Sequence, residues 1–94
     1  REKMKERIVI TVIGEDKTGI VANVSTKLSE LKLNIIDITQ KVFEDNIFAM
    51  IMLVEVEKNV DIKKLQEEFK VFEGKIGVKV FLQHEEIFKT MHRI

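Results

Sequence analysis

The chain has 94 residues, of which 45% are hydrophobic, and it contains no cysteine and no proline. Its 16 basic residues balance 16 acidic ones, so there is no net charge to recruit nucleic acid or an anionic membrane surface. The length predicts a single domain over residues 1–94. The absence of cysteine excludes a disulfide framework, a thiolate metal site and a cysteine nucleophile.

Neither a membrane span nor a secretion signal is evident. The longest apolar run, Ile47 to Val54, is far too short to cross a bilayer. The first residues, "REKMKER", are charged and lack the apolar centre of a signal peptide, so we expect a cytoplasmic location.

The chain opens with a strand and a helix. Residues 7–13, "RIVITVI", are apolar on both parities, which predicts a central strand buried on two faces. After a glycine-containing loop, apolar residues recur every three or four positions and predict a helix from about Gly19 to Leu33. Asn34 is predicted to end this helix in a left-handed turn.

The next segments predict a hairpin. Residues 35–43, "IIDITQKVF", alternate between apolar and polar side chains, as in a half-solvated strand at a sheet edge. The turn residues 44–46, "EDN", lead into a long apolar strand over 47–57. Met50 and Met52 fall at strand spacing, which favours a place in the core or an interface.

A second helix and a fourth strand follow. Asp61 is a candidate N-cap, and Gly74 and Gly77 mark the expected end of the helix. Its apolar stripe consists of Ile62, Leu65, Phe69 and Phe72. Residues 78–84, "VKVFLQH", alternate again as a strand, and residues 85–94 form an amphipathic tail.

The order of elements predicts an α+β, ferredoxin-like βαββαβ sandwich over residues 7–84. In this arrangement two helices cover one face of a four-stranded antiparallel sheet, and the tail adds a short C-terminal helix. The two central strands are apolar on both faces, so the second face also needs a cover. We therefore expect a homodimer, with the tail packed against its own domain or across to the partner. The apolar residues of the tail are Ile87, Phe88, Met91 and Ile94.

The first loop, "GEDKTGIV", is the candidate binding site. The spacing from Gly14 to Gly19 matches the front half of a phosphate-binding loop, but the Lys and Ser or Thr that should follow are absent. A helix start here would present backbone N–H groups at Gly19, Ile20 and Val21 to a carboxylate. Asp16 could accept hydrogen bonds from an ammonium group, so the loop would read both ends of an α-amino acid. Alternatively, Asp16 or Thr18 only caps the helix.

The histidines and the paired glutamates do not indicate a metal site or a catalytic site. His84 and His92 have no cysteine or paired carboxylate at metal-ligand spacing, so no metal site is predicted. The adjacent pairs Glu67-Glu68 and Glu85-Glu86 point in different directions and do not indicate acid–base catalysis. No cofactor is predicted, and the chain is not expected to be an enzyme.

The stretch "GEDKTGIVANVSTKLSELKLNIIDITQ" resembles the opening of an ACT domain, and the tail "IFKTMHRI" is similar to that of small stand-alone ACT proteins of bacteria and archaea. The resemblance covers nearly the whole chain. It implies a regulatory module that binds a small ligand, often an amino acid, at a dimer interface beside the loop. The implied ligand-binding residues are Asp16, Lys17, Thr18, Gly19, Ile20, Val21 and, from a neighbouring subunit, Asn34.

Ferredoxin-like folds host several functions, so alternatives need weighing. Strand 7–13 has no aromatic residue to stack on RNA bases, and a copper chaperone would need paired cysteines. An acylphosphatase would place an arginine in the first loop, where this chain has only Lys17. No helix has a basic face for direct DNA binding, so a sensor would act through a protein effector. Two hypotheses remain: an amino-acid-sensing regulatory domain, and a structural dimerisation module without a ligand.

Overall fold

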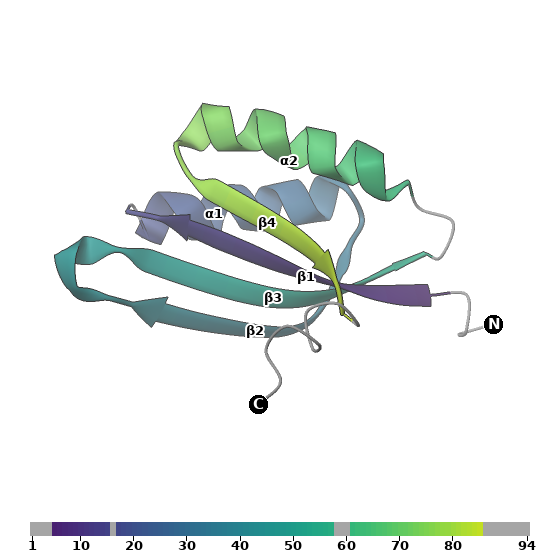
Figure 1. The fold of residues 1–94 in the computed structure, drawn as a ribbon, viewed down its shortest axis with the longest axis horizontal. Coiled ribbons are helices and arrows are strands. Elements are labelled where there is room, and N and C mark those ends of the chain that lie inside the picture. Colours follow the sequence, from purple (N-terminus) through teal and green to yellow (C-terminus); the bar gives the residue numbers. More distant parts are fainter. Residues whose placement is uncertain (1–4, 16, 58–60, 86–94) are drawn as a thin grey trace.

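The computed structural model describes residues 5–15, 17–57 and 61–85. Its elements are β1 (Lys5–Gly14), α1 (Lys17–Glu30), β2 (Asn34–Val42), the 3-10 turn η2 (Glu44–Asn46), β3 (Phe48–Glu57), α2 (Ile62–Ile76) and β4 (Lys79–His84). This order confirms the predicted βαββαβ arrangement (Figure 1). Apart from Glu85, the predicted C-terminal helix lies outside the described residues.

The four strands form one antiparallel sheet in the order β2-β3-β1-β4. β1 and β3 are central, while β2 and β4 are the two edges, as Figure 1 shows. The strand order confirms that β2 is an edge strand. The prediction that it is half-solvated was wrong, since all nine of its residues are exposed. Its register shifts at a bulge between Ile35 and Asp37.

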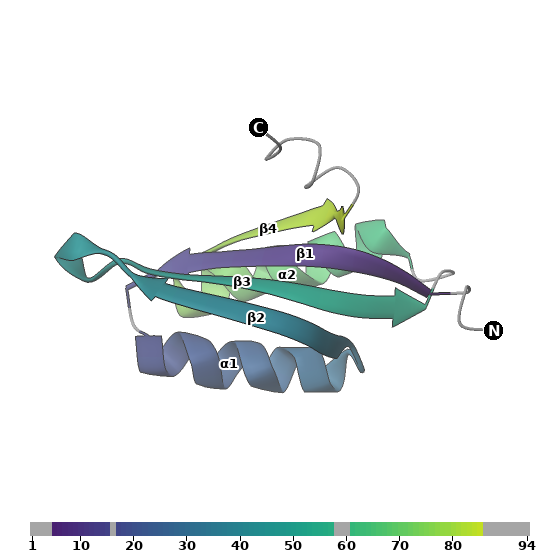
Figure 2. The same ribbon diagram turned by 90° about the horizontal axis from the view of Figure 1, so that it is seen from below.

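Both helices pack against the same face of the sheet, here called the helix-covered face (Figure 2). Alternate residues of the central strands point into this core because side chains of a strand alternate between faces. The buried strand residues of the core are Ile8, Ile10, Val12, Phe48, Met50, Met52, Val54 and Val56. The helices contribute Ile20, Val24, Leu28, Leu65, Phe69 and Phe72, which confirms the predicted stripes.

The opposite face, here called the open face, carries the intervening residues of each strand. The strand register places the following residues there: Val9, Thr11 and Ile13 of β1; Asp37, Thr39 and Lys41 of β2; Ala49, Ile51 and Leu53 of β3; and Lys79, Phe81 and Gln83 of β4. Phe81 is 54% exposed and Ile51 38% exposed. The described residues therefore leave apolar surface on this face.

The structure confirms the predicted N-cap of α2, Asp61, and its predicted end at Gly77. The Asp61 carboxylate accepts hydrogen bonds from the backbone N–H groups of Lys63 and Lys64 at 3.1 and 3.4 Å. Gly77 ends the helix in the left-handed region, at φ 70°. The prediction that Gly74 also marks the end was wrong, since it lies inside α2.

The end of α1 requires a second correction. Asn34 does not end the helix: it is the first residue of β2, and Lys32 adopts the left-handed conformation with φ 58°. The Lys32 N–H donates to the Ser29 carbonyl, and the Leu33 N–H donates to the Leu28 carbonyl, both at 3.0 Å. This is the Schellman pattern, which is most often closed by glycine. Because Lys32 stands where glycine is usual, the sequence did not predict this motif.

In the described part of the chain, no helix is long and apolar enough to cross a membrane.

Candidate functional site

The junction of β1 and α1 is the predicted ligand loop. β1 ends at Gly14, and α1 begins at Lys17, about two residues earlier than the sequence indicated. Ile20 and Val21 are therefore the fourth and fifth residues of the helix. From about this point, helix N–H groups donate to carbonyls one turn earlier. The donors that this helix start offers to a ligand thus belong to its first turn, from Lys17 to Gly19.

Packing explains the glycine at the end of β1. A Cβ atom placed on Gly14 would lie 2.7 Å from Ile20 Cδ1 and 2.7 Å from Val78 Cγ1. Carbon atoms in ordinary contact are about 3.5–4.0 Å apart. Gly14 therefore allows Ile20 of α1 and Val78, the residue before β4, to pack closely against the end of β1, and this role requires no ligand.

The other predicted loop residues divide into two groups. The Ile20 side chain is buried in the core, and Val21 packs against the core from its edge. Thr18 is exposed, and the Gly19 carbonyl accepts a hydrogen bond from Asn23 Nδ2 at 2.7 Å. Asp16 lies outside the described residues. The buried Ile20 side chain is therefore not available to a ligand.

Asn34 does not join the loop within one chain. It pairs with Glu55, whereas Gly14 pairs with Phe48 at the other end of β3. Seven residues of extended chain separate these ends, and at about 3.3 Å per residue the distance is roughly 23 Å. Asn34 could reach a loop of this kind only in a second copy of the chain.

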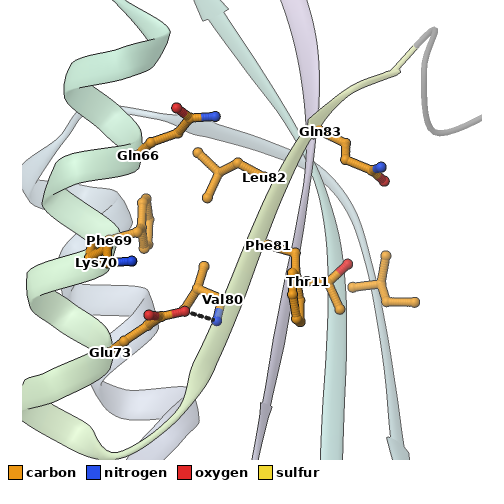
Figure 3. Close-up of a pocket in the computed structure, with 10 residues that line it drawn as sticks. Thr11, Gln66, Phe69, Lys70, Glu73, Val80, Phe81, Leu82 and Gln83 are labelled. Carbon is orange, nitrogen blue, oxygen red and sulfur yellow. Dashed lines mark hydrogen bonds between the residues drawn. The ribbon is translucent and has the colours of Figure 1, made fainter.

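A hollow of about 800 Å³ runs along the outer edge of β4, and the sequence analysis did not identify it (Figure 3). Gln66, Lys70 and Glu73 line it from α2, and Figure 3 shows Val80 and Leu82 beside them on β4. The Glu73 carboxylate accepts a hydrogen bond from the Val80 N–H at 2.7 Å. This bond occupies one donor of a free strand edge, so the carboxylate has a structural partner.

An ion pair joins the two helices. Lys27 Nζ lies 2.8 Å from Glu68 Oε1, and this hydrogen bond, together with the charge of Lys27, lowers the pKa of Glu68 below its ordinary value. His84 Nε2 lies 3.4 Å from Glu6 Oε1. Among the residues that the structure describes, no group of three or more His, Asp or Glu side chains is arranged to hold a metal ion.

The fold and the loop together define a class of protein: a small βαββαβ domain in which a central strand leads directly into a helix at a tight loop. The chain belongs to the ACT domain family, whose model matches residues 6–83, and within it to the UPF0237 proteins of archaea and bacteria. This membership confirms the resemblance drawn from the loop and the tail.

Three comparisons illustrate the relationship. The chain is 51% identical over 89 residues to a UPF0237 protein of Methanocaldococcus jannaschii, covering 94% of this chain and 98% of the relative. An ACT domain protein from Streptococcus pneumoniae has a similar structure, with a TM-score of 0.80, 43% identity, and coverage of 89% of this chain and 94% of that one. The regulatory subunit of aspartate kinase from Thermus thermophilus gives a TM-score of 0.63 and 26% identity, covering 83% of this chain and 50% of that one.

Proposed function

We propose that this protein is a dimeric regulatory sensor that binds an amino acid at the junction of β1 and α1. The observation that carries the proposal is the direct passage from β1 into a helix of 14 residues in a member of the ACT domain family. The similarity to a regulatory subunit of aspartate kinase supports a regulatory role.

The chemistry of the loop fits both charged ends of an amino acid. The first turn of a helix combines N–H donors with the positive end of the helix dipole, so it favours a carboxylate. Asp16, just before α1, supplies a negative charge for the ammonium group. Such a ligand brings its own positive charge, so the loop does not need the lysine of a nucleotide-binding loop. The ligand signal would then pass to a protein effector.

The exposed apolar side chains favour β2 as the dimer surface. Of the described residues, five large hydrophobic side chains exposed on β2 and its turn are Ile35, Ile36, Ile38, Val42 and Phe43. Exposed apolar clusters of this kind mark interaction sites, and an edge strand offers unpaired backbone groups. A second copy that paired antiparallel with β2 would extend the sheet.

That pairing would also give Asn34 a role. In an antiparallel pair related by a two-fold axis, the start of one β2 lies beside the end of the other. The end of β2 is the end of the sheet at which Gly14 lies, since Val42 and Gly14 both pair with Phe48. Asn34 of one subunit would therefore lie at the same end of the extended sheet as the loop of its partner.

A structural dimerisation module without a ligand is the second candidate. The close packing around Gly14 and the burial of Ile20 favour it, because they account for two loop positions by folding alone. A thermal-shift screen of the common amino acids distinguishes the two functions. A ligand at 100 times its Kd adds about 2.7 kcal/mol to the stability of the folded state, which raises Tm by about 10 °C or more in a domain of this size. If no amino acid raises Tm, the sensor proposal is wrong and the dimerisation module is favoured.

A further inference from the structure

The outer edge of β4 carries backbone groups that point away from the sheet. The Val80 N–H donates to the Glu73 carboxylate at 2.7 Å, so it points away from β1. In an antiparallel pair, residues that bond to the neighbouring strand alternate with residues that do not. Leu82 is two residues further along β4, so its N–H and C=O groups also point outward. Among the described residues, no strand pairs with this edge.

The hollow of about 800 Å³ beside β4 reaches both faces of the sheet. Val80 and Leu82 line it on the helix-covered face, where they pack at the rim of the core. Thr11 and Phe81 line it on the open face, and Figure 3 shows Phe81 on the other side of β4 from Gln66 of α2. A small-molecule site usually encloses most of its ligand, whereas an added strand places alternate side chains on both faces of a sheet. The shape of the hollow therefore fits an added strand.

We infer that β4 is the docking edge for an extended segment of another protein, which adds to the sheet as a further strand and hydrogen-bonds to Leu82. In this mode of recognition, main-chain bonds give affinity and the side chains of the added strand give specificity. Its apolar side chains would cover Leu82 on one face and Phe81, which is 54% exposed, on the other. The edge would be the contact surface for the protein effector, and the inference rests on the proposed function only for that role.

Charge adds one requirement to the docking segment. Of the described residues that line the hollow, Lys70 is the one cation and Glu73 the one anion. The Glu73 carboxylate already accepts from the Val80 N–H, whereas no described residue forms an ion pair with Lys70. Complementary charges favour the correct partner and register at an interface. We therefore expect an acidic residue in the segment, opposite Lys70.

A second copy of this chain fits the β4 edge less well. The proposed dimer pairs through β2, which is the opposite edge of the sheet. If β4 also paired with β4 of a further copy, the two kinds of contact would alternate without closing, and the sheet would grow into a filament. The bond from Val80 to Glu73 opposes such growth because it occupies one N–H group of the edge. A segment of a different protein would instead end the sheet.

Amide hydrogen exchange of the full chain tests the inference without added amino acid, so the result does not depend on the sensor proposal. Random peptides of about ten residues, the length of a long strand, are displayed on phage and selected against the full chain. The most enriched peptide is synthesised as the probe. At saturation, it should slow exchange of the Leu82 N–H about ten-fold or more. The Gln40 N–H, which points outward from β2, should exchange at an unchanged rate.

Charge reversal supplies a matched pair of variants. Lys70→Glu should weaken peptide binding about five-fold or more, because it replaces an attraction by a repulsion. Lys75→Glu is the control, since Lys75 is also exposed on α2 but lines a hollow beside α1 instead of β4. It should leave the Kd of the peptide unchanged. Circular dichroism checks that both variants are folded.

Each outcome decides the inference. Slower exchange at Leu82, together with weaker binding by Lys70→Glu alone, supports it. The inference is overturned if no peptide is enriched, if exchange slows at Gln40 rather than at Leu82, or if both variants bind equally well. It is also overturned if the Leu82 N–H exchanges slowly before any peptide is added, because a second copy or another part of the chain would then already occupy the edge.

Discussion

Replacement of Gly14 by alanine should destabilise the protein through overpacking at the start of α1. The added Cβ would lie 2.7 Å from methyl carbons of both Ile20 and Val78, about 1 Å closer than ordinary contact. Val78 is β-branched and buried, so its side chain has little freedom to move away. Overpacking of this kind costs about 1–3 kcal/mol, and the reduced entropy of the unfolded chain offsets about 0.4–1 kcal/mol of it. We expect a net loss of roughly 0.5–2 kcal/mol.

Gly74→Ala is the matched control. Gly74 lies inside α2, and a Cβ there would meet nothing within 4 Å. Alanine is favoured over glycine within a helix by about 0.5–1 kcal/mol, so this variant should be more stable than the natural chain. Urea unfolding at one fixed protein concentration measures both changes. If Gly14→Ala were as stable as Gly74→Ala, the close approach of α1 and β4 to Gly14 would be refuted.

Three further predictions follow from the caps, the ion pair and the exposed strand. Asp61→Ala should cost about 0.5–2 kcal/mol in urea unfolding, because two N–H groups at the start of α2 lose their acceptor; an unchanged midpoint would contradict the cap. The ion pair of Glu68 with Lys27 stabilises the folded state above the ordinary pKa of Glu68, and this contribution is lost as pH falls through the lowered pKa. The natural chain should therefore lose more stability than Glu68→Gln between neutral pH and strong acid, and parallel losses would contradict the pair. Ile38→Asp should dissociate the proposed dimer in sedimentation, whereas Val71→Asp, an equally drastic change on exposed α2, should not; a dimer in both variants would exclude the β2 surface.

The order of the elements and the core could be predicted because periodicity reports burial. Residues 7–13 and 47–57 are apolar at every core position, and the stripe of α2 has helical spacing. Asp61 and Gly77 were predictable because each residue type has a local role at a helix end. The ends of α1 were less predictable. Its C-terminus is closed by Lys32, a residue type without a preference for the left-handed conformation, and Asn34 misled the prediction.

The position of the loop between β1 and α1 was predictable from the sequence, but its packing was not. The loop between Gly14 and Gly19 was identified from its glycines, yet Gly14 is required by contacts with Ile20 and with Val78, far along the chain. No local pattern reports such a contact. The distance between Asn34 and Gly14 likewise depends on strand pairing rather than on sequence separation. The hollow along β4 is lined by residues of both α2 and β4. It therefore depends on how these two elements pack, which no local sequence pattern predicts.

Calorimetric titration with the amino acid that raises Tm most tests the sensor proposal directly. The natural chain is compared with Asp16→Ala, which removes the proposed partner of the ammonium group, and with Gly19→Val, which crowds the first turn of α1. Circular dichroism and sedimentation confirm that each variant remains folded and assembled. The account predicts binding by the natural chain and no measurable binding by either variant. Equal binding by all three proteins would contradict it, since the ligand would then bind away from the loop.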